Sequence, residues 1–258
     1  MATWNAGIGV EQIREVDRLM VEEYGITLLQ MMENAGRSLA ALARIQLGGN
    51  LAGARIVALI GPGNNGGGGL CTARHLVNAG ASVTIALAGE PPLHNEAPEH
   101  QRRILERMGV LGSDHATDTS TLSALLNQAD LVLDALLGYS GQGAPREPLA
   151  GFIRSANGTF APRIALDLPS GLASDTGELG DPTLLADATV TLAWPKTGAL
   201  AAAARPFVGD LYLADISVPE AVYHAVGVRR GDVFTAGPIV RLRVHHGVWR
   251  SEEAAMLL

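Results

Sequence analysis

The sequence predicts an α/β fold: a Rossmann-like three-layer αβα sandwich with a mostly parallel sheet and two extra N-terminal helices. Short continuous apolar runs alternate with amphipathic segments, a pattern typical of parallel strands that are buried on both faces and joined by helices. The 258 residues are 47% hydrophobic but 4% aromatic, and 31 of them are glycine. This composition favours a turn-rich α/β domain over a helical bundle.

Two helices are predicted before the first expected strand. The first spans residues 10–23 and places three apolar residues on one face: Ile13, Val16 and Met20. Thr27 and Gln30 have the spacing of a capping box, which predicts the start of the second helix. Because both helices precede any predicted strand, we expect them to pack on the outside of the sheet.

Strands and helices then alternate along the chain. Strands are expected at residues 55–60, 82–88, 131–133, 163–166, 188–193 and 211–214, and helices at 70–79, 96–108 and 148–155. A glycine-rich turn, 61–69, joins the first strand to the following helix. We predict one domain over residues 1–226 and a C-terminal extension of uncertain structure over 227–258, in which 239–244 is a candidate edge strand and 251–258 a short helix or a disordered end.

Charge and composition exclude several classes of protein. The net charge of −7 and pI near 5.5, without a basic stripe, argue against binding to nucleic acid. No apolar stretch reaches the roughly 18 residues that a membrane span needs. Residues 1–9 lack the pattern of a signal peptide, and the single cysteine, Cys71, suits a reducing compartment. We therefore expect a cytoplasmic protein.

The glycine-rich turn 61–69 is the first candidate for ligand binding. Glycines between a strand and a helix let the backbone approach a ligand, and the amides of the helix N-terminus favour an anion. Such a turn is weak evidence alone, because any tight connection uses glycine. Asn64 and Asn65 are more specific: they tolerate left-handed backbone geometry, or they present side-chain oxygens and amides to a cation or a substrate.

Two aspartates follow predicted strands. Asp134 and Asp167 stand at carboxyl ends of parallel strands, where open α/β sheets bind their ligands. Either aspartate could instead cap the following turn. The presence of both on the same edge of the sheet as the Asn–Gly loop favours a functional role. The loop after Asp134 ends at Arg146, which either binds phosphate or pairs with Glu147 at the surface.

Two further polar residues need an interpretation. Lys196, the only lysine, is expected to be a turn residue or, as a second choice, a phosphate contact. His75 is expected to be a packing or surface residue, and no zinc site is predicted because no cysteine or carboxylate is expected at ligand spacing around it.

Together the segments resemble a known family. Residues 32–37 (MENAGR), 61–69 (GPGNNGGGG), 134–138 (DALLG) and 167–172 (DLPSGL) occur in the same order in the NAD(P)H-hydrate epimerase family, the YjeF N-terminal domain. Residues 186–191 and 195–196 are similar to its next block, so the resemblance covers about residues 10–219. As an ordered set these motifs are specific, although each alone is modest.

The resemblance implies a Rossmann-like fold, a bound potassium ion, and interconversion of the R and S epimers of hydrated NADH and NADPH. It implies potassium ligands at Asn65, Asp134 and Ser170. It implies substrate contacts at Asn64, Asn65, Gly66, Gly67, Gly68, Gly138, Tyr139, Ser140, Gly141, Gln142, Gly143, Ala144, Pro145, Arg146 and Asp167. Asp167 is the predicted catalytic residue, a general base and acid in turn. A separate NAD(P)H-hydrate dehydratase is the expected pathway partner, and a homodimer the expected assembly.

The sequence departs from the family at Gly68 and Ala173, where the family usually has Asp. Gly68 lies in the expected substrate loop, so it keeps an alternative open: a catalytically impaired ligand-binding or dimerising scaffold of the same family. An ordinary nicotinamide dehydrogenase ranks lower, because the glycine spacing and the ribose-binding acidic residue after the second strand are absent.

Overall fold

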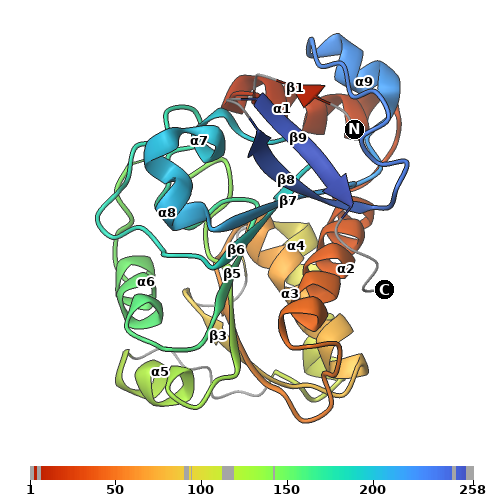
Figure 1. Ribbon diagram of the computed structural model, residues 1–258. Helices are drawn as coiled ribbons and strands as arrows, with labels where there is room; N and C mark the ends of the chain where they lie inside the picture. Colours follow the sequence, from red (N-terminus) through yellow and green to blue (C-terminus); the bar gives the residue numbers. More distant parts are fainter. Residues whose placement is uncertain are drawn as a thin grey trace.

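A nine-stranded, mostly parallel sheet lies between two layers of helices (Figure 1) in the computed structural model, which describes residues 3–4, 7–89, 93, 95–111, 119–141, 143–245 and 248–253. The strands are β1 (Thr3–Trp4), β2 (Arg55–Ile60), β3 (Ser82–Leu87), β4 (Leu131–Ala135), β5 (Arg163–Leu166), β6 (Ala188–Leu192), β7 (Asp210–Ala214), β8 (Ile239–His245) and β9 (Val248–Glu253). Their order is β1-β9-β8-β7-β6-β5-β4-β2-β3. Neighbours from β3 to β7 pair in parallel, and β8, β9 and β1 add antiparallel pairs. The predicted fold class is confirmed.

Helices cover both faces of this sheet. They are α1 (Val10–Arg18), η1 (Leu19–Glu23), α2 (Leu28–Gln46), α3 (Asn64–Asn78), α4 (Glu96–Arg107), α5 (Thr119–Leu126), α6 (Leu149–Asn157), α7 (Thr197–Leu200), η2 (Ala202–Ala204), α8 (Arg205–Val208) and α9 (Glu220–Ala225). In Figure 1, α2, α3 and α4 lie on one face and α5 to α8 on the other. No described helix has both the length and the apolar character needed to cross a membrane.

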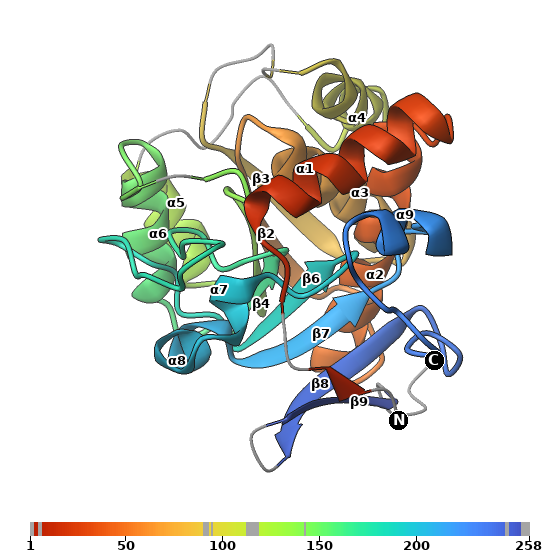
Figure 2. The ribbon, with the colours of Figure 1, turned by 90° about the horizontal axis from the view of Figure 1, so that it is seen from above.

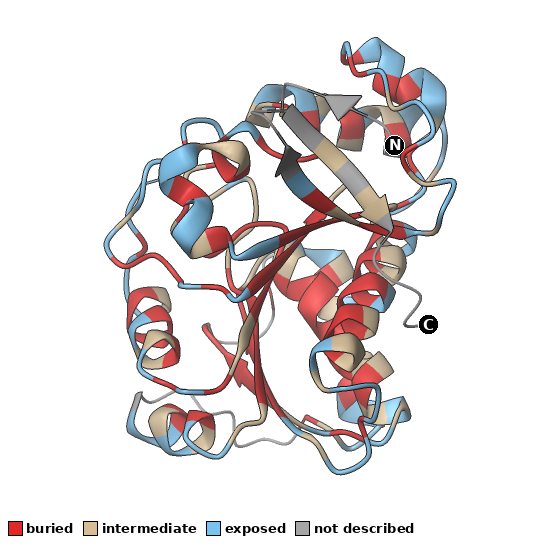
Figure 3. Ribbon diagram, in the orientation of Figure 1, coloured by how far each residue is buried: buried red, intermediate tan, exposed pale blue. Residues whose placement is uncertain are grey.

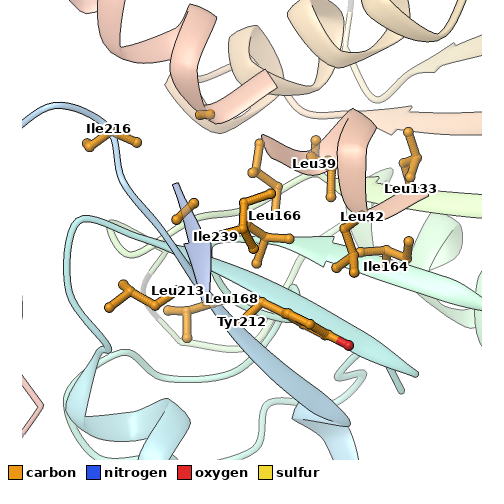
Figure 4. Packing of buried hydrophobic residues seen from close by; sticks show 14 of the residues in the cluster. Leu39, Leu42, Leu133, Ile164, Leu166, Leu168, Tyr212, Leu213, Ile216 and Ile239 are labelled. Carbon is orange, nitrogen blue, oxygen red and sulfur yellow. The ribbon is translucent and has the colours of Figure 1, made fainter. Parts of the chain in front are cut away.

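The core is divided by the sheet into two parts. Successive residues of β2 point to opposite faces, so Ile56 belongs to the larger cluster under α2 and α3, and Val57 to the smaller one under α5 and α6. Figure 3 shows the central strands buried along their length. Figure 4 shows Leu39 and Leu42 of α2 packed near Ile164 of β5, and full burial of each leucine contributes about 1.5–3 kcal/mol.

Most expected elements are present, with shifted ends. The capping box at Thr27 is confirmed: its side chain accepts from the Gln30 amide, and the Gln30 side chain accepts from the Thr27 amide. A strand, β1, precedes the two helices, contrary to expectation. The glycine-rich turn is shorter than expected, because α3 already begins at Asn64. Strand β4 extends to Ala135 and so includes Asp134, and α5 was not predicted.

The C-terminal segment completes the sheet. The strand predicted at 239–244 is present as β8, but the prediction that it lies at the edge of the sheet is wrong, because β8 pairs with β7 on one side and β9 on the other. Residues 251–253 belong to β9 rather than to a helix, and 254–258 lie outside the described residues. The division of the chain at residue 226 stays a prediction.

Candidate active site at the carboxyl ends of the strands

A pocket of about 300 Å³ lies between α1 and the carboxyl ends of the central strands. Its walls are mainly apolar, with Ile13 and Val16 from α1, Met31 from α2 and Leu166 from β5. In Figure 2, α1 crosses in front of α3 on this side of the molecule. The N-terminal helix therefore forms a roof over the edge where parallel sheets bind ligands.

Asp167 is fixed at the floor of this pocket. It is the first residue after β5 and has a φ of 71°, in the left-handed region that few non-glycine residues adopt. Its Oδ2 accepts a hydrogen bond from the Tyr139 amide at 3.0 Å, and its Oδ1 accepts one from the Leu192 amide at 3.3 Å. Strained backbone held by several partners is common at functional sites.

Lys196 forms a buried ion pair with Asp167. Its Nζ donates to Asp167 Oδ1 and to the Leu192 carbonyl at 2.8 Å, and the lysine side chain is 1% exposed. Neither sequence-based expectation for Lys196 describes this position, because the ammonium group faces the predicted catalytic carboxylate. The pair places one negative and one positive group side by side within a largely apolar pocket.

Asp17 and Tyr139 form a second polar pair in the same pocket. No sequence motif indicated a role for Asp17. The Tyr139 hydroxyl donates to Asp17 Oδ2 at 2.6 Å. Burial raises the pKa of Asp17, while the hydrogen bond from Tyr139 and the charge of Lys196 oppose the increase and Asp167 adds to it. Burial and the nearby Asp17 also raise the pKa of the Tyr139 phenol. Tyr139 therefore contacts both carboxyl groups of the pocket.

The predicted potassium ligands surround the turn after β4. Asp134 is fully buried and accepts from the Ser170 hydroxyl at 2.6 Å, the Ser170 amide at 2.8 Å and the Leu136 amide at 3.1 Å. Burial raises its pKa to about 6, although these hydrogen bonds act against the shift. The Asn65 side chain packs against Gly138, where a Cβ would come 3.2 Å from Asn65 Oδ1, and its Nδ2 donates to the Leu166 carbonyl at 3.2 Å. In the described part of the chain Asp134 has no cationic partner. An all-oxygen donor set around an uncompensated buried carboxylate fits a hard cation.

Two glycines let α3 begin close to the sheet. A Cβ on Gly66 would lie 1.9 Å from the Gly61 carbonyl oxygen, and one on Gly69 would lie 2.4 Å from Ala135 Cβ. Gly68 lines the pocket, and its Cβ would meet Leu166 Cδ2 at 2.8 Å, so a larger residue there would have to displace a leucine methyl. No side chain of the described residues caps α3, and the residues at its start, Gly63, Asn64 and Asn65, line the pocket.

The structure brings together only part of the expected substrate set. Asn64, Asn65, Gly68, Gly138, Tyr139, Ser140 and Asp167 line the pocket. Gly66 and Gly67 are buried within α3, Gly141 and Gly143 line a small neighbouring hollow, and Ala144, Pro145 and Arg146 line neither. Gln142 lies outside the described residues.

Another polar cluster joins α2 to α3. His75 Nε2 lies 2.9 Å from Glu33 Oε1, and the Cys71 thiol lies 3.3 Å from Glu33 Oε2. The expectation that no cysteine or carboxylate would stand near His75 is therefore wrong: Cys71 is one helical turn away and Glu33 comes from α2. Arg74 contacts both Glu33 and Cys71. The Arg74 guanidinium group occupies the space next to the atoms that could otherwise bind a metal ion. The cluster is therefore an ion-pair network that holds the two helices together.

Cys71 is expected to be unreactive in the folded protein. It is completely buried, and burial together with the charge of Glu33 raises the pKa of its thiol to about 12, so almost no thiolate forms at neutral pH. A thiol-specific chromogenic reagent at pH 8 should therefore label no cysteine in native protein and one per chain in denaturant. Stoichiometric labelling of the native protein within minutes would contradict this description of the α2–α3 interface.

The fold and the pocket together define a Rossmann-like α/β protein with a pocket at the carboxyl ends of its parallel strands, where open α/β sheets bind ligands, and a buried carboxylate–lysine pair in that pocket. The family model described as "YjeF-related protein N-terminus" matches residues 28–198, and the chain belongs to this family.

Named relatives extend over most of the chain. The NAD(P)H-hydrate epimerase of Dehalogenimonas lykanthroporepellens is 42% identical over 91% of this chain and 92% of its own length. The bifunctional NAD(P)H-hydrate repair enzyme of Salinibacter ruber is 37% identical over 86% of this chain, which spans 42% of that larger protein. The crystal structure of yeast ynu0 matches with a TM-score of 0.78 and 26% identity, covering 92% of this chain and 99% of the yeast chain.

Proposed function

We propose that this protein is an NAD(P)H-hydrate epimerase, which interconverts the R and S epimers of hydrated NADH and NADPH. The observation that carries the proposal is the buried Asp167–Lys196 pair in a pocket at the strand ends. A relative named for this activity is 42% identical over nearly the whole chain. The direct test is to follow purified R-hydrated NADH by NMR with and without the protein.

The proposed reaction inverts C6 of the hydrated nicotinamide ring. The C6–O bond breaks as the lone pair of N1 forms a C6=N1 double bond, and a proton from a carboxyl group turns the departing hydroxide into water. Water then adds to the opposite face of C6 and gives a proton to a carboxylate. Asp167, which lines the pocket, would exchange a proton on its own side of the ring and stabilise the positive charge that develops on the ring.

Lys196 and the apolar walls support this chemistry. The ion pair fixes the Asp167 carboxyl group in place and puts a positive group beside it. The side chains of Ile13, Val16 and Leu166 exclude bulk water from the ring, and electrostatic interactions are stronger in such surroundings. The amides at the start of α3 are the proposed contact for a phosphate of the dinucleotide.

We also propose that potassium binds to Asn65, Asp134 and Ser170. When bound, the ion would supply positive charge that balances the buried Asp134 carboxylate and orders the turns after β4 and β5. The support is the all-oxygen donor set and the missing counter-charge at Asp134 in the described residues.

Potassium is therefore expected to stabilise the folded protein. At ten times its dissociation constant, a ligand that binds the folded state alone adds about 1.4 kcal/mol, which corresponds to roughly 3–6 °C in Tm for a chain of this size. The melting curve should shift upward when tetramethylammonium chloride is replaced by KCl at equal ionic strength. Asp134→Asn should lose the shift and Asp167→Asn should keep it. Identical Tm values in both salts would contradict the site.

Three further proposals rest on the sequence and the resemblance. The protein acts in the cytoplasm, forms a homodimer and works with an NAD(P)H-hydrate dehydratase. The bifunctional names of several relatives support the last of these, because the present chain spans less than half of those proteins. The scaffold alternative retains one supporting observation, Gly68 in the pocket wall, where the family usually has Asp.

A further inference from the structure

Inversion at C6 needs proton transfer on both faces of the ring. Water must leave from one face and arrive at the other. Asp167 cannot turn between the two, because Lys196 and the Leu192 amide hold its Oδ1 while the Tyr139 amide holds its Oδ2. A side chain fixed in this way serves the face of the ring that lies against the strand ends.

Asp17 lines the same pocket from a different element of the fold. It projects from α1, the roof, whereas Asp167 follows β5, at the floor. One of its oxygens is oriented by the Tyr139 hydroxyl, and the other accepts no hydrogen bond from the residues that the structure describes. A ring between roof and floor would therefore have one carboxyl group on each face.

We propose that Asp17 is the second proton-transfer residue of the epimerase, acting on the ring face opposite to Asp167. The inference rests on the proposed function. In one direction Asp17 gives a proton to the departing hydroxyl group, which leaves as water as the C6–O bond breaks. A second water then adds on the other face, and Asp167 accepts its proton. The reverse direction exchanges the two roles, and protons return to their starting positions by exchange with solvent.

The electrostatic surroundings of Asp17 and Asp167 differ in a way that suits their two proposed roles. The titratable groups that face Asp17 are Asp167, Lys196 and the neutral Tyr139 phenol, from three different segments. Burial and Asp167 favour the protonated form of Asp17, whereas Lys196 lies directly against Asp167. Two carboxyl groups whose environments differ in this way are suited to act as acid and base.

Oxygen exchange distinguishes a catalytic role from a positioning role. The experiment uses each epimer of hydrated NADH in ¹⁸O-labelled water and records both inversion at C6 and incorporation of the label. Wild-type protein should exchange the C6 oxygen with every inversion. In Asp17→Asn the kcat for inversion should fall by about 10²–10⁴-fold in both directions with KM within a few-fold. The epimer whose hydroxyl faces Asp167 should still exchange its oxygen without inversion.

Two more variants complete the test. Tyr139→Phe removes the hydroxyl that orients Asp17 but keeps the backbone N–H of residue 139 that donates to Asp167. The rate of inversion should therefore fall less than in Asp17→Asn, and exchange without inversion should persist. Glu15→Gln removes a carboxylate from the solvent-exposed side of the same helix and should change neither rate. Inversion by Asp17→Asn within three-fold of wild type would overturn the proposal, as would equal loss of inversion and of exchange for both epimers. Failure of the wild type to invert either epimer would instead defeat the proposed function.

Discussion

Replacing Asp167 by asparagine is expected to reduce epimerisation to the spontaneous rate. General acid–base catalysis contributes about 10²–10⁴-fold, and the amide can neither accept nor deliver the proton. The change keeps the size of the side chain, and Asn tolerates the φ of 71° at this position. An amide oxygen can still accept from Lys196, so the variant should fold, with a lower Tm. Initial rates by NMR and melting by circular dichroism measure both effects.

Asp130→Asn is the matched control for this variant. Asp130 precedes β4 at the opposite end of the sheet and pairs with Arg55 at the surface, where such an ion pair contributes about 0–1 kcal/mol. The Asp130→Asn variant should turn over the substrate at the wild-type rate. Turnover of the Asp167→Asn protein close to that of wild type would remove Asp167 from the reaction.

Replacing Lys196 by methionine is expected to cause the largest loss of stability. Removing one partner of a buried ion pair costs about 3–5 kcal/mol, because the remaining charge has no counter-charge. Here Asp167 is 4% exposed, so water cannot easily compensate. For a chain of this length the Tm should fall by roughly 6–20 °C. Turnover should fall as well, because a buried carboxylate without its counter-charge tends to become protonated.

A double variant separates the charge from the packing. If the uncompensated Asp167 carboxylate causes the loss, Asp167→Asn should raise the Tm when it is added to Lys196→Met, although it lowers the Tm in the wild-type background. Additive losses in the double variant would show that Lys196 stabilises the protein through its packed methylene groups instead.

Much of the fold was predictable because local patterns and the tertiary structure agree. The apolar run of β2 is buried on both faces, and the capping box at Thr27 starts α2 as expected. The start of α3 was not predictable in this way, because glycines disfavour helices. There the close approach of α3 to β2 and β4, seen at Gly66 and Gly69, overrides that tendency.

The site was predictable where its residues lie at strand ends. Asp134 and Asp167 were found because carboxyl ends of parallel strands share one edge. Lys196 and Asp17 were missed because their partners are distant in sequence: Lys196 reaches back to Asp167, and Asp17 meets Tyr139 across the pocket. One signal was present, since Asp17 lies one turn from Ile13 on the otherwise apolar face of α1.

The proposed activity is tested most directly by starting from each pure epimer of hydrated NADH in turn, in KCl, and following both time courses by NMR. An epimerase must bring the two mixtures to the same R/S ratio. We predict that wild-type protein does so far faster than the spontaneous reaction, and that the Asp167→Asn protein follows the spontaneous course from both sides. If folded wild-type protein accelerates neither time course, the pocket belongs to a ligand-binding relative that has lost the chemistry.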